Sequence, residues 1–129
     1  MPKATRSEIA AARAVVLQRD QNTCQRCGVN VLYQLASVQH RIPRGAGGSA
    51  KVWQVSNLAL VCGWATTPGS CHNWMEHENR KQAEFDGWLL PKLNADIDTE
   101  QEPLLTIHGW ITLDDRGGSH PYLPQEVPA

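Results

Sequence analysis

The sequence lacks any uninterrupted apolar run near the roughly 20 residues that a helix needs to cross a bilayer. Its first residues contain no apolar segment of the kind found in signal peptides, and the chain has no internal repeat or low-complexity tract. At 129 residues it has room for one hydrophobic core. We therefore expect a single cytoplasmic domain that has no membrane partner.

The chain also has few cysteines, four in 129 residues. In a reducing compartment, cysteines are metal ligands or free thiols more often than disulfides. Cys24 and Cys27 have the CxxC spacing whose side chains converge on adjacent vertices of a zinc tetrahedron, and eight residues separate Cys62 from Cys71. We predict one structural Zn²⁺ held by these four residues; a CxxC redox pair and unrelated buried cysteines are the alternatives.

Net charge is nearly absent, at −1 for the whole chain. Residues 1–92 nevertheless contain 11 Lys and Arg against 6 Asp and Glu, whereas residues 93–129 contain only Arg116 against 7 acidic residues. The basic part predicts a phosphate-facing surface, for which a merely solvated surface with a sign bias is the alternative. We predict an N-terminal unit over 1–92 and an acidic C-terminal extension over 93–129 that packs on it and ends in a frayed segment.

A helix is predicted at the start of the chain, over residues 5–19. Thr5 and Glu8 have the spacing of a capping box, in which each side chain satisfies a free backbone donor. The apolar stripe of this helix comprises Ile9, Val16 and Leu17. Its arginines are expected to remain available to solvent or phosphate: Arg6, Arg13 and Arg19.

Five further elements follow from the pattern of apolar residues. Gly28 allows the positive φ that a cysteine turn often needs, and Gly87 is predicted to end the helix. The predicted elements are a strand over 35–42, a strand or turn over 57–62, a helix over 72–86, and extended segments over 104–107 and 110–113.

Between the two cysteine pairs lies an ordered set of polar residues. His40 is on the first predicted strand, a glycine-rich loop spans 45–49, Asn57 precedes a short apolar run, and His72 follows Cys71 at the start of a helix. In this order the sequence from about 20 to 91 resembles the HNH endonuclease family, and more closely the small HNH proteins of bacteriophages that infect actinobacteria. The resemblance implies an α+β fold with a zinc-stapled ββα-metal core (the His-Me finger), to which the N-terminal helix and the extended C-terminal segment are added.

The resemblance also implies a reaction. Cleaving a phosphodiester needs an activated water, and the ordinary pKa of histidine near 6.5 leaves His40 able to accept its proton at pH 7. By resemblance His40 is the general base, His72 binds a catalytic Mg²⁺ or Mn²⁺, and the Asn57 amide ties the loop between the strands and so positions His40. The implied activity is nicking of DNA to 5′-phosphate and 3′-hydroxyl ends, in a host cytoplasm, in genome packaging beside phage terminase subunits.

Two positions depart from the family pattern. Gln39 stands where the family commonly has Asp or His as a metal ligand, and a neutral amide binds a hard cation more weakly. On the helix, Glu76 shares a face with His72 at the i,i+4 spacing, whereas His77 is turned away. We predict Glu76 as the second helical ligand, with His77 as the alternative if the helix begins irregularly.

Candidate DNA contacts come from the basic residues of this region. They are Arg41, Arg44, Lys51, Arg80 and Lys81, and they would position phosphates without reading bases. The backbone of loop 45–49 is a further candidate, with a flexible linker as its alternative. The tryptophans are expected to fill the core: Trp53, Trp64, Trp74 and Trp88. Two rival functions stay open, a non-catalytic zinc module that binds DNA or a packaging protein, and a cysteine-based redox or regulatory protein.

Overall fold

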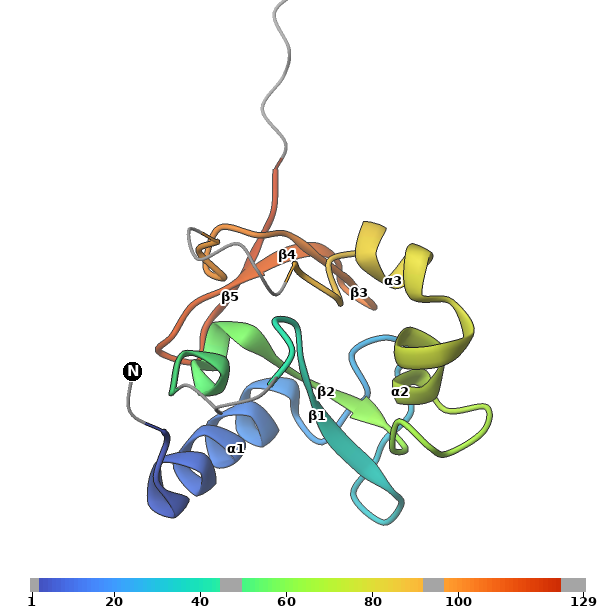
Figure 1. Cartoon of the computed structure of the whole chain (residues 1–129), viewed down its shortest axis with the longest axis horizontal. Coiled ribbons are helices and arrows are strands. Elements are labelled where there is room, and N and C mark those ends of the chain that lie inside the picture. Colours follow the sequence, from blue (N-terminus) through green and yellow to red (C-terminus); the bar gives the residue numbers. More distant parts are fainter. Residues whose placement is uncertain (1–2, 45–49, 92–96, 124–129) are drawn as a thin grey trace, which may run out of the picture.

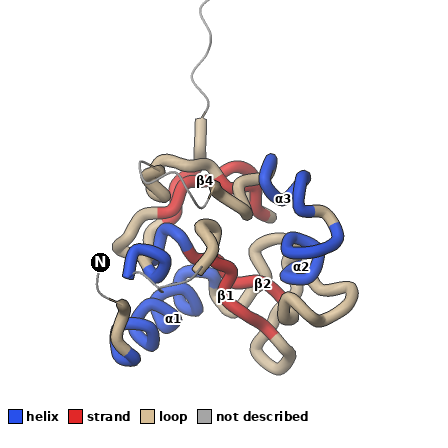
Figure 2. Tube along the Cα trace, in the orientation of Figure 1, coloured by secondary structure: helices blue, strands red, loops and turns tan. Residues whose placement is uncertain are grey.

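The computed structural model describes residues 3–44, 50–91 and 97–123, and it is an α+β fold with two small antiparallel sheets (Figures 1 and 2). The first sheet pairs β1 (Ala36–His40) with β2 (Leu58–Cys62). The second has the order β3 (Leu104–Thr106), β4 (Gly109–Leu113) and β5 (Ser119–Pro121). The helical elements are α1 (Arg6–Asp20), η1 (Ala50–Trp53), η2 (Val55–Asn57), α2 (Cys71–Asn73), η3 (Trp74–Glu78) and α3 (Arg80–Phe85).

The β1–β2 hairpin lies between two helical regions. Figure 1 shows α1 on one side of it, the run from α2 to α3 on the other, and the second sheet across the remaining side. The hairpin register pairs His40 with Leu58 and Gln39 with Ala59. None of the helices in the described ranges has the length and apolar character that crossing a membrane demands.

The capping box predicted for α1 is present. Thr5 Oγ1 accepts a hydrogen bond from Glu8 N at 3.1 Å, and Glu8 Oε1 accepts one from Thr5 N at 3.0 Å. Val16 is fully buried as expected, but Leu17 is 40% exposed and so lies outside the core. The core-facing stripe of α1 is therefore narrower than the apolar pattern predicts.

Arg19 is not available to solvent, contrary to prediction. Its guanidinium pairs with Asp20 at 2.8 Å, and both side chains are only 4% exposed. Arg19 also donates to the carbonyls of Val55 and Leu58, and Asp20 accepts from Leu60 N at 2.9 Å. The pair thus fastens the end of α1 to β2, and each charge is stabilised by the other and by backbone dipoles.

The single helix predicted over 72–86 is divided into three short pieces. α2 gives way to η3, which is one π-helical turn, and Asn79 then leaves helical geometry at φ −142° before α3 begins. The predicted stop is confirmed: Gly87 has φ +85°, and a Cβ there would lie 2.1 Å from the Pro103 carbonyl oxygen. Only glycine fits a position with both restrictions.

Arg41 is fully buried, which removes it from the predicted phosphate contacts. Its guanidinium donates to five backbone carbonyls, those of Gly87, Ser56, Thr99, Glu102 and Pro103. Burial lowers its pKa to about 10, so it remains charged at pH 7. A buried cation needs such a full set of acceptors, and here three of the five lie in the C-terminal extension.

The C-terminal extension is consequently part of the main core. Leu104, Ile111 and Leu113 are at most 6% exposed and belong to the same apolar cluster as Val16 and Leu58. The two predicted extended segments are β3 and β4, a hairpin as expected, and β5 adds a strand that the apolar pattern did not indicate.

Replacing Arg41 tests its role as the link between these parts. We expect Arg41→Met to lower the free energy of unfolding by roughly 3 kcal/mol or more, because five carbonyls lose their donor, three of them in buried hydrogen bonds. Arg6→Met, on an exposed position of α1, should change it by no more than about 0.5 kcal/mol. Urea denaturation of both variants measures this; equal stabilities would show that the Arg41 contacts contribute nothing.

Candidate functional site

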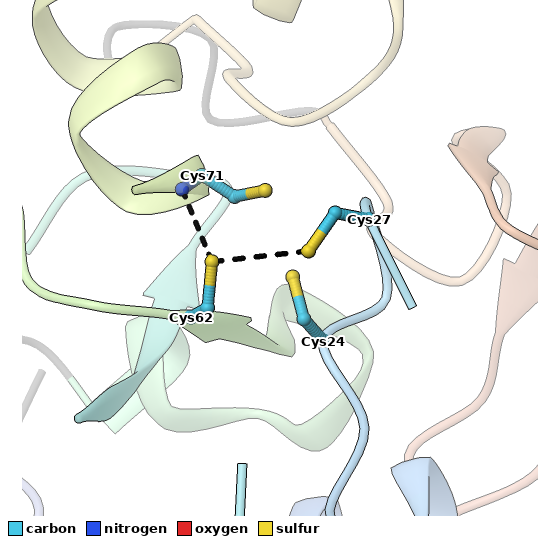
Figure 3. Close-up of side chains that lie close together, drawn as sticks. All are labelled: Cys24, Cys27, Cys62 and Cys71. Atoms are coloured by element: carbon cyan, nitrogen blue, oxygen red, sulfur yellow. Dashed lines mark hydrogen bonds between the residues drawn. The ribbon is translucent and has the colours of Figure 1, made fainter. Parts of the chain in front are cut away.

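Four cysteine side chains meet at one end of the hairpin (Figure 3). Cys24 and Cys27 come from the turn after α1, Cys62 ends β2, and Cys71 begins α2. Their sulfur atoms all lie within 4.8 Å of one another, and none of the four forms a disulfide. The Sγ atoms of Cys27 and Cys62 are 3.9 Å apart, close to the edge of about 3.8 Å of a tetrahedron with Zn–S bonds of ~2.3 Å.

The surroundings of the cluster act differently on its thiols, and burial raises the pKa of Cys27. A hydrogen bond from Cys71 lowers the pKa of Cys24 to about 4, and the same bond raises the pKa of Cys71. Cys71 N donates to the Cys62 sulfur at 3.3 Å, and Arg26 Nη1 donates to the Cys71 sulfur at 3.4 Å. These donors offset the negative charge that four thiolates would bring to one ion. Gly28 has the expected positive φ of +84°, which lets the turn close around Cys24 and Cys27.

A cavity of about 650 Å³ adjoins the hairpin and contains most of the predicted catalytic residues. His40 and Gln39 contribute from β1, His72 and Glu76 from the opposite helical region, and Arg44 from the segment after β1. His77 is exposed and does not line the cavity. Of the two alternatives on the helix, the structure therefore places Glu76 beside the other candidates.

Two side-chain contacts connect β1 to the helical region. Ser37 Oγ lies 2.5 Å from His72 Nδ1, and Gln39 Nε2 donates to Glu76 Oε1 at 3.1 Å. Residues two apart on a strand are about 6.6 Å apart and residues four apart on a helix about 6 Å, so the two spacings match. The two contacts lie side by side and hold His72 and Glu76 against one face of β1.

The Ser37 contact also decides which nitrogen of His72 carries the proton. Ser37 donates its one hydroxyl hydrogen to the Gly63 carbonyl at 2.6 Å, so toward His72 it acts as acceptor of Nδ1–H. Burial lowers the pKa of His72, which favours the neutral ring. In that ring Nε2 has a lone pair and is able to accept a proton or bind a metal ion.

His40 is held against an indole ring. Its imidazole meets Trp53 edge to face, with ring centres 4.5 Å apart and an interplanar angle of 90°. Burial, with the charges of Arg44, Arg13 and His72, lowers the pKa of His40 to about 4, so the ring is neutral at pH 7. His40 Nε2 is buried and has no hydrogen-bond partner among the described residues.

Asn57 ties together the segments on either side of this histidine. The side chain is fully buried; Oδ1 accepts from Ile42 N at 2.7 Å, and Nδ2 donates to the carbonyls of Ile42 at 3.2 Å and Val52 at 3.0 Å. Ile42 lies two residues after His40, and Val52 lies next to Trp53. The amide thus connects the segment that follows His40 to the one that carries Trp53.

The remaining predicted DNA contacts have different surroundings. Arg44 is exposed at the cavity, Lys81 is exposed on α3, and Lys51 is half-buried in η1. Arg80 is paired with Glu76, with 3.3 Å between Nη1 and Oε2. The glycine-rich loop 45–49 lies outside the described residues. Arg13, which the helix pattern left available, lines the cavity and lies over the Trp53 ring at 5.2 Å.

The sequence reasoning missed three residues of this region. Ser37 holds His72, Trp53 holds His40, and Arg26 donates to Cys71 while lying 3.5 Å from the centre of the Trp74 ring. For Ser37 a signal existed, because alternation along the strand places it on the same face as Gln39. Trp53 and Trp88 are buried as expected, whereas Trp64 is 53% exposed, contrary to its predicted place in the core.

Together these features define an α+β protein with small sheets and a cluster of four cysteines that could hold a metal ion such as zinc. Within the described ranges, no other compact group of three or more His, Cys, Asp or Glu ligands is found. Comparisons with protein-family models, curated proteins and solved structures returned no match for this chain.

Removing one sulfur tests the cysteine cluster. We expect the purified protein to contain one zinc per chain by elemental analysis, and Cys62→Ser to lose it. Because the cluster joins three segments, the variant and the chelator-treated protein should both unfold roughly 10 °C or more below the zinc-loaded protein. Reduced, folded protein that contains no zinc and is insensitive to chelation would contradict the assignment.

Proposed function

We propose that this protein is a metal-dependent endonuclease of the HNH type, with β1, β2 and α2 as its ββα-metal core, and that it nicks DNA. The observation that carries the proposal is the cavity that gathers His40, His72 and Glu76 beside Arg13 and Arg44. A proton acceptor, two candidate metal ligands and two cations on one surface are the groups that phosphodiester hydrolysis requires. A place in phage genome packaging beside terminase subunits remains part of the proposal by resemblance.

Two residues suit a catalytic divalent ion. His72 directs its protonated nitrogen to Ser37, which leaves Nε2 as a donor atom, and Glu76 offers a carboxylate. Mg²⁺ and Mn²⁺ commonly use few protein ligands and complete their shell with water and substrate phosphate. When bound, such an ion would offset charge on the scissile phosphate and on the departing 3′ oxygen.

Gln39 supports this arrangement in a way that differs from a direct ligand. Its amide nitrogen donates to Glu76 Oε1 and also to the carbonyls of His40 at 3.2 Å and Trp88 at 3.3 Å. The side chain is only 1% exposed, so it has little freedom to rearrange. We infer that Gln39 holds the Glu76 carboxylate in place, and coordination through its amide oxygen stays a prediction.

His40 is the proposed general base. Its neutral ring at pH 7 can take a proton. Nε2 is buried and has no hydrogen-bond partner among the described residues. Trp53 restricts the ring to one orientation, and Asn57 holds the segments that carry both residues. Arg13 and Arg44 would bind the phosphates on either side of the scissile bond.

Cleavage of supercoiled plasmid tests the proposed reaction. We expect nicking with Mg²⁺ or Mn²⁺, none with EDTA, and a loss of at least about 100-fold in His40→Ala. His108→Ala is the matched control, because His108 is exposed and does not line the cavity. If the folded, zinc-loaded protein binds DNA but cuts it with no divalent ion, the nuclease is refuted and the non-catalytic zinc module becomes the proposed function.

A second variant tests whether Trp53 positions the base. We expect Trp53→Leu to lower kcat for nicking roughly 10-fold or more, because His40 loses the ring that orients it. Trp53→Phe keeps an aromatic face and should recover most of the rate. If side-chain volume alone mattered, Trp53→Phe and Trp53→Leu would have similar rates. Circular dichroism confirms folding, and unchanged kcat in folded Trp53→Leu would refute the positioning role.

A further inference from the structure

A large aromatic side chain at the cavity has no role in the proposed reaction. Trp64, on the loop between β2 and α2, is 53% exposed and lines the cavity together with His72. Leu17, on α1, is 40% exposed and lines it as well. Two large apolar side chains left in water beside candidate catalytic groups indicate a surface that a ligand covers.

The loop that carries Trp64 is held firmly by hydrogen bonds. Trp64 N donates to Thr67 Oγ1 at 3.0 Å, and the Trp64 carbonyl accepts from Thr67 N at 2.9 Å and from Ser70 Oγ at 3.1 Å. The next carbonyl, that of Ala65, accepts from Asn73 Nδ2 at 2.6 Å, which fastens the loop to α2. The backbone beneath the exposed indole is thus fixed before a ligand binds, and a ligand pays little ordering entropy there.

The rest of the lining limits what that ligand can be. Arg13 and Arg44 supply positive charge, whereas Val38, Leu60 and Ala65 supply apolar surface. A nucleotide combines a flat aromatic base with an anionic phosphate and so matches both kinds of surface. In an intact duplex each base is stacked between its neighbours, and only an unpaired base can place its face on an indole.

We propose that Trp64 is a stacking platform for an unpaired base of the DNA, close to the scissile phosphate. The preferred substrate is then DNA with unpaired nucleotides, such as a single strand, a flap or a branch, rather than a continuous duplex. The inference rests on the proposed function for the identity of the nucleic acid. The stacking itself is a binding event that does not depend on cleavage.

Equilibrium binding tests the platform without cutting. In the His40→Ala background with Mg²⁺, fluorescence anisotropy would compare a labelled 12-nucleotide single strand of DNA with a fully paired duplex of the same sequence. We expect Trp64→Ala to weaken single-strand binding roughly 10-fold and duplex binding less than about 3-fold, in line with the loss of one base–aromatic stack. Trp64→Phe should retain most of the single-strand affinity.

Phe85→Ala is the matched control. Phe85 is 76% exposed on α3 and does not line the cavity, so its removal should change neither affinity. Unchanged single-strand binding in Trp64→Ala, or an equal loss for both DNAs, would overturn the platform. Tighter binding of the matching RNA strand would overturn the choice of DNA.

The two proposals fail separately. If the protein cuts no DNA but Trp64→Ala weakens single-strand binding, the stacking platform is supported and the nuclease is refuted. If the protein nicks plasmid and needs His40 to do so, but Trp64→Ala binds every DNA normally, the nuclease is supported and the stacking platform is refuted.

Discussion

The meeting of four cysteines at one end of the β1–β2 hairpin is the constraint on which the proposed site depends. β1 and β2 have five residues each and α2 has three, lengths at which isolated elements are unstable in water. The cluster joins the turn after α1, the end of β2 and the start of α2. His72 directly follows Cys71, so the place of the Cys71 sulfur in the cluster also fixes the backbone position of His72.

From this anchor the site extends by short polar contacts. Ser37 and Gln39, on one face of β1, hold His72 and Glu76. On the other side Asn57 holds the segments that carry His40 and Trp53. Each candidate group is therefore supported by a side chain that is itself buried or fixed, and such support is what precise catalytic geometry requires.

Buried charge determines how the C-terminal extension relates to this site. The extension is acidic, and it contacts the core in two ways: its backbone carbonyls surround Arg41, and the Asp115 carboxylate accepts a hydrogen bond from Ser56 N at 3.0 Å. Arg41 directly follows His40, so the extension stabilises the end of the strand that carries the proposed base. Leu104 of β3 and Ile111 and Leu113 of β4 belong to the hydrophobic core.

Local sequence determined what depends on local interactions: the capping box at Thr5 and Glu8, the CxxC turn with Gly28, both hairpin strands, and the stop at Gly87. It also indicated the residues that gather at the cavity. Tertiary structure alone decided that Arg19 and Arg41 are buried, that Trp64 is exposed, and that the 72–86 helix is broken. Burial of a long side chain depends on acceptors and neighbours far away in the sequence, and residue type and spacing do not encode those distances.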